Sequence, residues 1–165
     1  MKKISLIAIM LLAVALVVGA GCTKKASENA AENILEESTG GDADVDIDDN
    51  TVRINVNGSS MEAGDNVSLP ADFPSDIYIA DGNLKSSSKT AENSFSVTIE
   101  TDKSVSEMQT EYETELANDG WDVNSSLAFQ GMVTLGGEKG DRMVTVSISE
   151  NEGKTWVIIA TAQTE

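Results

Sequence analysis

The sequence predicts an α+β fold: a mostly antiparallel sheet with one amphipathic helix on one face, in a ββαββββ-like order, preceded by an acidic stalk. Three observations predict it. Residues 94–100 alternate apolar and polar side chains, as a half-buried strand does. Residues 104–119 repeat apolar side chains at three- and four-residue spacings, as one helix face does. After them come only strand-like segments separated by glycine-containing turns, so helix and sheet can bury their apolar faces in two layers.

The N-terminus has the order of charge, hydrophobe and small residues that defines an export signal. Lys2 and Lys3 precede an apolar run at 4–18, and small residues at 19–21 lead into Cys22. This order resembles the lipobox of bacterial lipoproteins. The resemblance implies that residues 1–21 are a lipoprotein signal peptide and that Cys22 carries a diacylglycerol anchor.

An uncleaved N-terminal transmembrane helix is the alternative. Residues 4–21 form a weakly polar stretch of 18 residues, near the lower limit of about 17–25 for spanning a bilayer. Gly19 also stands where lipoboxes usually carry Leu or another aliphatic residue. Both alternatives place the body outside the cytoplasm. The predicted localisation is therefore extracytoplasmic, with the membrane bound through lipid on Cys22 in the cell membrane or the outer membrane.

Residues 22–69 have the composition of an acidic stalk or linker. Between residues 26 and 66 there are 11 acidic residues and one basic residue, Arg53. Apolar residues at helical spacing predict a short helix at 27–37, and alternation of Val and Ile with polar residues predicts a β-hairpin at 44–57. A two-stranded hairpin alone is barely stable in water, so this hairpin either packs on the main domain or forms transiently.

The α+β domain is expected at 70–165, after the prolines at 70 and 74. Residues 77–84 are the first strand or an extended entry, residues 86–90 a polar edge or turn, and residues 94–100 the next strand. Ser104 and Glu107 form a capping-box pattern at the start of the helix, and Gly120 ends it. Further strands are expected at 121–129, 132–135, 143–149 and 155–162.

Composition excludes several classes of function. The chain has 28 acidic and 11 basic residues, a net charge of −17, so nucleic acid and anionic headgroups are not expected partners. It has no histidine and one cysteine, which excludes Ser-His-Asp and Cys-His catalysis and His- or Cys-based zinc sites. We predict a protein that is not an enzyme, with no catalytic residues and no cofactor.

Closely spaced carboxylates suggest a calcium site, because Ca²⁺ takes six to eight oxygen ligands. The candidate metal ligands are Asp42, Asp44, Asp46 and Asp48. The segment does not fit an EF-hand loop, because its sixth position is Ile47 and its twelfth is Arg53. The same alternation also suits the solvent face of an edge strand, where charge discourages unwanted pairing.

Four other residues are candidates for binding. Lys139 and Arg142 flank a mixed-charge turn that could hold a carboxylate, although ion pairs within the turn would explain them equally. Trp121 and Trp156 are the candidate binding aromatics, since partly exposed indole rings favour interfaces. A core position is the alternative for both.

Four segments resemble small uncharacterised bacterial lipoproteins that carry one soluble α+β domain: 73–76 (FPSD), 115–121 (ELANDGW), 139–142 (KGDR) and 144–147 (VTVS). The resemblance implies a fold and a location but no catalytic residues. The function expected from the sequence is a membrane-anchored, non-catalytic accessory module that binds a protein or peptide of the envelope. A Ca²⁺-binding protein and a hydrolase of envelope polymers that uses only carboxylates are the alternatives.

Overall fold

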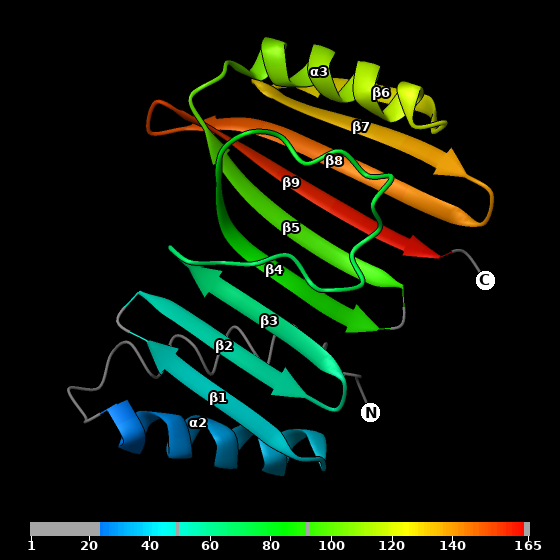
Figure 1. Cartoon of the computed structure of the whole chain (residues 1–165). Helices are drawn as coiled ribbons and strands as arrows, with labels where there is room; N and C mark the ends of the chain where they lie inside the picture. The colour runs from blue at the N-terminus through cyan, green and yellow to red at the C-terminus, as the bar shows by residue number, and fades with distance from the viewer. Residues whose placement is uncertain (1–23, 49, 92, 164–165) are drawn as a thin grey trace.

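The computed structural model describes residues 24–48, 50–91 and 93–163. The predicted signal peptide and Cys22 therefore lie outside the described residues. Those residues form two helices and one antiparallel sheet of nine strands, in the order β1-β2-β3-β4-β5-β9-β8-β7-β6 (Figure 1). The elements are α2 (Lys24–Thr39), β1 (Ala43–Asp48), β2 (Thr51–Val56), β3 (Ser59–Gly64), β4 (Asn83–Ala91), β5 (Ser94–Thr101), α3 (Val105–Asn118), β6 (Asp122–Phe129), β7 (Met132–Lys139), β8 (Arg142–Asn151) and β9 (Lys154–Gln163).

The predicted fold class is wrong, because the segment expected to be a stalk belongs to the sheet. Residues 24–64 form α2 and β1–β3, and β3 pairs with β4 over four residue pairs, from Ser60 with Lys89 to Ala63 with Ser86. One sheet of nine strands with two helices packed on it therefore replaces the expected domain of six strands and one helix, with the predicted helix at 27–37 and hairpin at 44–57 part of the same sheet structure instead of a stalk. The physical reason is that β4 supplies the neighbour that an isolated hairpin lacks.

The polar segment at 86–90 was also predicted wrongly as an edge or turn. It lies in β4, between β3 and β5. Ser87 is buried there, and its hydroxyl donates to the carbonyl of Ser68 at 2.6 Å. Serine-rich strands have little apolar alternation, which explains why neither β3 nor β4 had a recognisable pattern. Residues 77–80 precede β4 and are not a strand, although Ile77 and Ala80 are buried.

The two helices cover opposite faces of the sheet. Ile54 of β2, Met61 of β3 and Ser88 of β4 are register partners, so their side chains share one face of the sheet. The adjacent set of register partners lies on the other face and comprises Arg53, Glu62, Ser87 and Val97. Ile54 packs in the core beneath α2, and Val97 packs in the core beneath α3. Successive residues of a strand point to opposite faces, so α2 covers β1 and β2 from one side and α3 covers β6–β8 from the other.

Helix α3 begins and ends as the sequence predicts. The amide of Glu107 donates to the Ser104 hydroxyl, and the Glu107 carboxylate accepts from the Ser104 amide at 2.8 Å, which completes the capping box. Gly120 has a φ of +83° directly after the helix. Met108, Tyr112 and Leu116 are buried against the sheet. Neither helix in the described part of the chain has the length and apolar character to cross a membrane.

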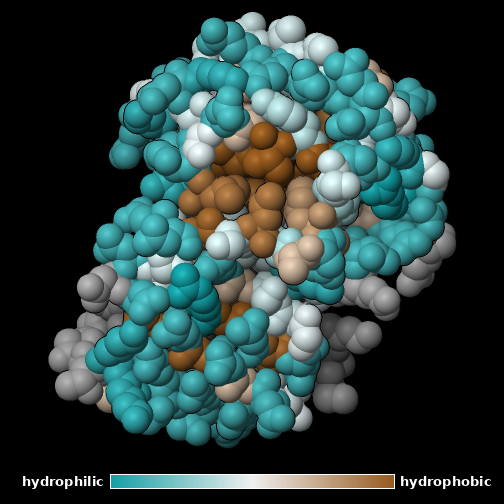
Figure 2. Space-filling view, viewed as in Figure 1, coloured by the Kyte–Doolittle hydropathy of each residue, from teal (hydrophilic) through white to brown (hydrophobic). Residues whose placement is uncertain are grey.

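The segment 65–82 connects β3 to β4 by crossing the face of the sheet on which α3 lies (Figure 1). Its residues Ile77 and Ala80 belong to the core beneath α3, and Phe73, Tyr78 and Ile79 pack at the border of that core. Figure 2, in the same view, shows apolar surface below α3 in the region that this segment crosses. The segment thus completes the cover of the sheet where α3 does not reach.

Candidate functional site

Three of the four predicted binding residues come together, but around a side chain of the protein itself. Lys139 ends β7 and Arg142 begins β8, so a tight turn brings both to the carboxylate of Asp76 in the crossing segment. Arg142 donates from Nη1 at 2.8 Å and from Nη2 at 2.5 Å. Lys139 Nζ donates to the same carboxylate at 2.6 Å. A planar guanidinium matches a carboxylate in this two-bond geometry.

Trp121 completes the cluster around Asp76. Its indole N–H donates to the Asp76 carbonyl oxygen at 2.7 Å, and the Arg142 guanidinium lies 5.0 Å from the centre of its ring. The two hydrogen bonds from Arg142, with the one from Lys139, hold the pKa of the Asp76 carboxyl well below its ordinary value. These groups already bind one another, so the cluster fastens the crossing segment to the sheet rather than presenting donors to a ligand. Trp156 lies elsewhere, half-buried in β9 beside Glu100 and Ser149.

The predicted calcium ligands are divided between solvent and ion pairs. Asp42 and Asp44 are exposed, and they lie before and within β1. The Asp48 carboxylate accepts from Arg53 at 2.9 Å and from Lys24 at 3.1 Å, and Asp46 lies 3.4 Å from Arg53. Within residues 24–48, 50–91 and 93–163, no three acidic side chains are placed to hold a metal ion together.

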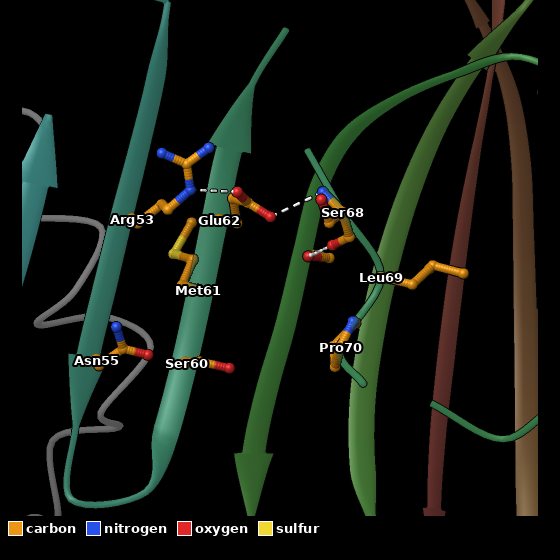
Figure 3. A pocket seen from close by; sticks show the side chains of 9 residues that line it. Arg53, Asn55, Ser60, Met61, Glu62, Ser68, Leu69 and Pro70 are labelled. Carbon is orange, nitrogen blue, oxygen red and sulfur yellow. Dashed lines mark hydrogen bonds and ion pairs between the residues drawn. The ribbon is translucent and has the colours of Figure 1, made fainter. Parts of the chain in front are cut away.

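A small pocket of about 140 Å³ lies between β2, β3 and residues 68–70 (Figure 3). Figure 3 shows Arg53 and Glu62 pointing toward each other, and their Nε and Oε1 atoms are 2.5 Å apart. The other Glu62 oxygen accepts from the Ser68 amide at 2.7 Å. The charged groups of the pocket are thus occupied in holding the start of the crossing segment.

A larger depression lies where the turn between β6 and β7 approaches the start of α3, and we call it the α3–hairpin groove. It has a volume of about 520 Å³. Its lining comprises Val105, Ser106 and Gln109 of α3, residues 128–133 of the hairpin, and Glu150 of β8. Gln130 and Gly131 form the turn with φ values of +50° and +83°, the conformation that a two-residue hairpin turn favours.

The groove is mainly uncharged, and its apolar side chains are accessible. Ala128 is exposed and Val105 is half-buried. Phe129 and Met132, which are 63% and 44% exposed, form the strand pair next to Ala128–Val133, so their side chains point to the other face of the sheet and only border the groove. Glu150 is the single charged residue of the lining, and its carboxylate has no partner among the described residues. Sequence reasoning missed this site. The available signal was a run of 15 residues without charge, from Val123 to Gly137, in a chain of which 24% is charged.

The comparisons with known proteins concern this part of the chain. A family model described as START domain-like matches residues 82–154. The matched residues run from β4 to the first residue of β9, and they include α3 and the whole lining of the α3–hairpin groove. A START-like fold is a helix-grip α+β fold, and here α3 lies across β6–β8. No curated protein and no solved structure matches the chain.

Similarity to a START domain-like family supports ligand binding as the general role of the chain. The similarity covers less than half of the sequence and identifies no ligand.

Proposed function

We propose that this protein is a non-catalytic binding module, tethered outside the cytoplasm through lipid on Cys22, that holds an extended peptide segment of an envelope protein in the α3–hairpin groove. One observation carries the proposal. The groove combines accessible apolar side chains with an unpaired carboxylate inside the residues similar to the START domain-like family.

The lining suits a peptide with an apolar side chain. Val105 and Ala128, one from each side of the groove, offer apolar contact to such a side chain. The Gln130 amide can both donate to and accept from a peptide backbone. A volume of about 520 Å³ also lies in the range of roughly 300–1,000 Å³ that is common for ligand sites.

Charge favours a neutral or basic peptide. Glu150 faces the groove without a counter-ion among the described residues, and a Lys or Arg of the ligand would supply one. The net charge of −17 also raises the rate at which cationic segments reach the surface. An acidic peptide would meet repulsion both in the groove and from the protein as a whole.

The test uses the full chain in detergent and a fluorescent octapeptide that alternates Lys, Val and Phe. The Glu150→Lys variant is expected to weaken binding about tenfold, because it replaces attraction with repulsion at the groove. Glu138→Lys changes the net charge equally at an exposed position outside the groove, so it is the matched control and should change binding less than twofold. Equal weakening by both variants, or no binding to the wild type, would contradict the proposed site.

The tether has its own test. Cells that express the chain are labelled with a radioactive fatty acid, and the protein is recovered from the membrane fraction. Label should enter the wild type and be absent from Cys22→Ala. Label that persists in Cys22→Ala would contradict lipidation at this residue and leave the groove proposal untouched.

A further inference from the structure

The two edge strands of the sheet, β1 and β6, differ in whether side chains bond to their outward backbone amides. The first edge, β1, is closed by carboxylates from α2: the Val45 amide donates to Glu32 at 3.2 Å, and the Ile47 amide donates to Glu28 at 3.1 Å. These amides would otherwise be free to pair with another strand, because each edge strand has a neighbour on one side only. Helix α2 therefore guards the β1 edge.

At the opposite edge, β6, no side chain of the described residues bonds to the backbone amides, and after a register irregularity between Val123 and Ser125 the strand is regular from Ser125 to Phe129. It pairs with β7 on one side and has no strand on its other side among the described residues. An antiparallel edge strand leaves alternate N–H and C=O groups without a strand partner. After Asp122 the strand contains no Lys, Glu or Pro, the residues that usually block edge pairing, and Leu127 and Phe129 are 67% and 63% exposed.

We infer that β6 pairs antiparallel with β6 of a second copy of this chain, so that one sheet continues through both copies. A pair centred on Leu127 joins residues 125–129 of the two strands and satisfies their outward backbone groups there. It places Leu127 of one copy opposite Leu127 and diagonal to Phe129 of the other, removing apolar surface from water. The inference goes beyond the proposed function, because it concerns an edge of the sheet and does not depend on peptide binding.

The uncharged β6 edge offers the kind of surface at which two acidic copies can meet. Two copies that each carry a net charge of −17 repel over most of their surfaces, so they can approach closely only through uncharged segments. Residues 123–137 form such a segment, and it includes nearly all of β6. In an antiparallel pair the two Asp122 carboxylates lie at opposite ends of the contact, where they do not face each other.

The guard on β1 explains why association stops at two copies. Pairing of β6 with β1 would be head-to-tail and would leave free edges, producing an open filament. Glu28 and Glu32 already occupy the β1 amides that such pairing needs. Pairing of β6 with β6 uses the same surface on both copies and is closed by a two-fold axis.

The experiment measures the molar mass of the full chain by light scattering at decreasing concentration, together with hydrogen–deuterium exchange. The wild type should dissociate from dimer to monomer on dilution, and exchange at 122–129 should be slower in the dimer. Leu127→Glu should weaken association at least about tenfold, because it brings like charges together across the new strand pair. Each protein is repeated with Cys22→Ala, so that sharing a micelle is not counted as association.

Met143→Glu is the matched control. Met143 is exposed on the same face of the sheet as Leu127 but lies in β8, away from the β6 edge. This variant should dimerise like the wild type. A monomeric wild type, equal effects of both variants, or protection at 43–48 instead of 122–129 would overturn the inference. Protection of 122–129 that requires added peptide and does not depend on protein concentration would also overturn it, in favour of a peptide at this edge.

Discussion

Replacing Asp76 with Asn tests whether one carboxylate fastens the crossing segment to the sheet. The substitution removes the charge that accepts two hydrogen bonds from Arg142 and one from Lys139. Charge-assisted hydrogen bonds contribute roughly 1.5–3 kcal/mol each when buried. Here the side chains of Asp76 and Arg142 are 27% exposed and that of Lys139 is 32% exposed, so water screens part of this energy.

We therefore expect Asp76→Asn to lower the free energy of unfolding by about 2–3 kcal/mol at pH 7. For a chain of this size the melting temperature should fall by about 4–12 °C. Urea unfolding followed by tryptophan fluorescence measures the change, since Trp121 donates to the Asp76 carbonyl and reports on the cluster. The transition should keep its slope, because the same surface is exposed on unfolding.

The contribution of Asp76 to the free energy of unfolding should depend on pH. Hydrogen bonds from Arg142 lower the pKa of Asp76 in the folded state, so its contribution is complete above the unfolded carboxyl pKa of about 3.9. It is lost as the pH falls below that value toward the folded pKa. The gap in stability between wild type and Asp76→Asn should therefore narrow below about pH 4.

Asp102→Asn is the control, because Asp102 also pairs with a lysine, Lys154, but its side chain is 85% exposed. An exposed pair of this kind contributes little to stability, because water and salt screen it. If Asp76→Asn cost no more than Asp102→Asn, or if its cost persisted unchanged at pH 3, the role assigned to the Asp76 cluster would be refuted.

Four further changes test other parts of the fold. Leu35→Ala should lower the free energy of unfolding in urea by about 2–4 kcal/mol, because Leu35 of α2 is fully buried against β1 and β2. Ser104→Ala should cost about 1 kcal/mol in the same assay and fray the start of α3 in hydrogen exchange. Gly64→Ala should cost more than about 1 kcal/mol, since φ is +138° there and an added Cβ meets backbone. The double variant Glu28→Ala, Glu32→Ala should form assemblies larger than dimers by light scattering, because the β1 amides become free; unchanged mass would contradict their guarding role.

Local patterns determined which elements could be predicted. Strand β5 and helix α3 were correct because each has a clear apolar period and the helix has a capping box. Strand β4 was missed because Ser86, Ser87 and Ser88 resemble a turn in the sequence. Its position depends on neighbours on both sides and on the Ser87–Ser68 hydrogen bond, and none of these is visible in a local window.

The binding candidates show the same limit. Residue type made Lys139, Arg142 and Trp121 candidates for binding a ligand, whereas in the structure all three contact Asp76. Their common partner, Asp76, precedes Lys139 by 63 residues and Arg142 by 66 residues, so no sequence spacing connects them. The same three side chains would form a binding site if their partner were the carboxylate of a ligand. Because the partner is Asp76, they stabilise the position of the crossing segment on the sheet.

The acidic residues of 24–64 explain why a sheet edge was mistaken for a stalk. An acid-rich composition predicts a solvated linker when each carboxylate is assumed to face water. Here Glu28 and Glu32 accept from edge amides, and Glu62 accepts from Arg53 and the Ser68 amide. Composition cannot separate these cases, because the difference lies in whether an unpaired N–H stands within reach of the carboxylate. The same reasoning applies to the β6 edge. Carboxylates occupy the outward amides of β1, whereas β6 after Asp122 has no acidic residue, so β1 is suited to remain unpaired and β6 to pair with another strand.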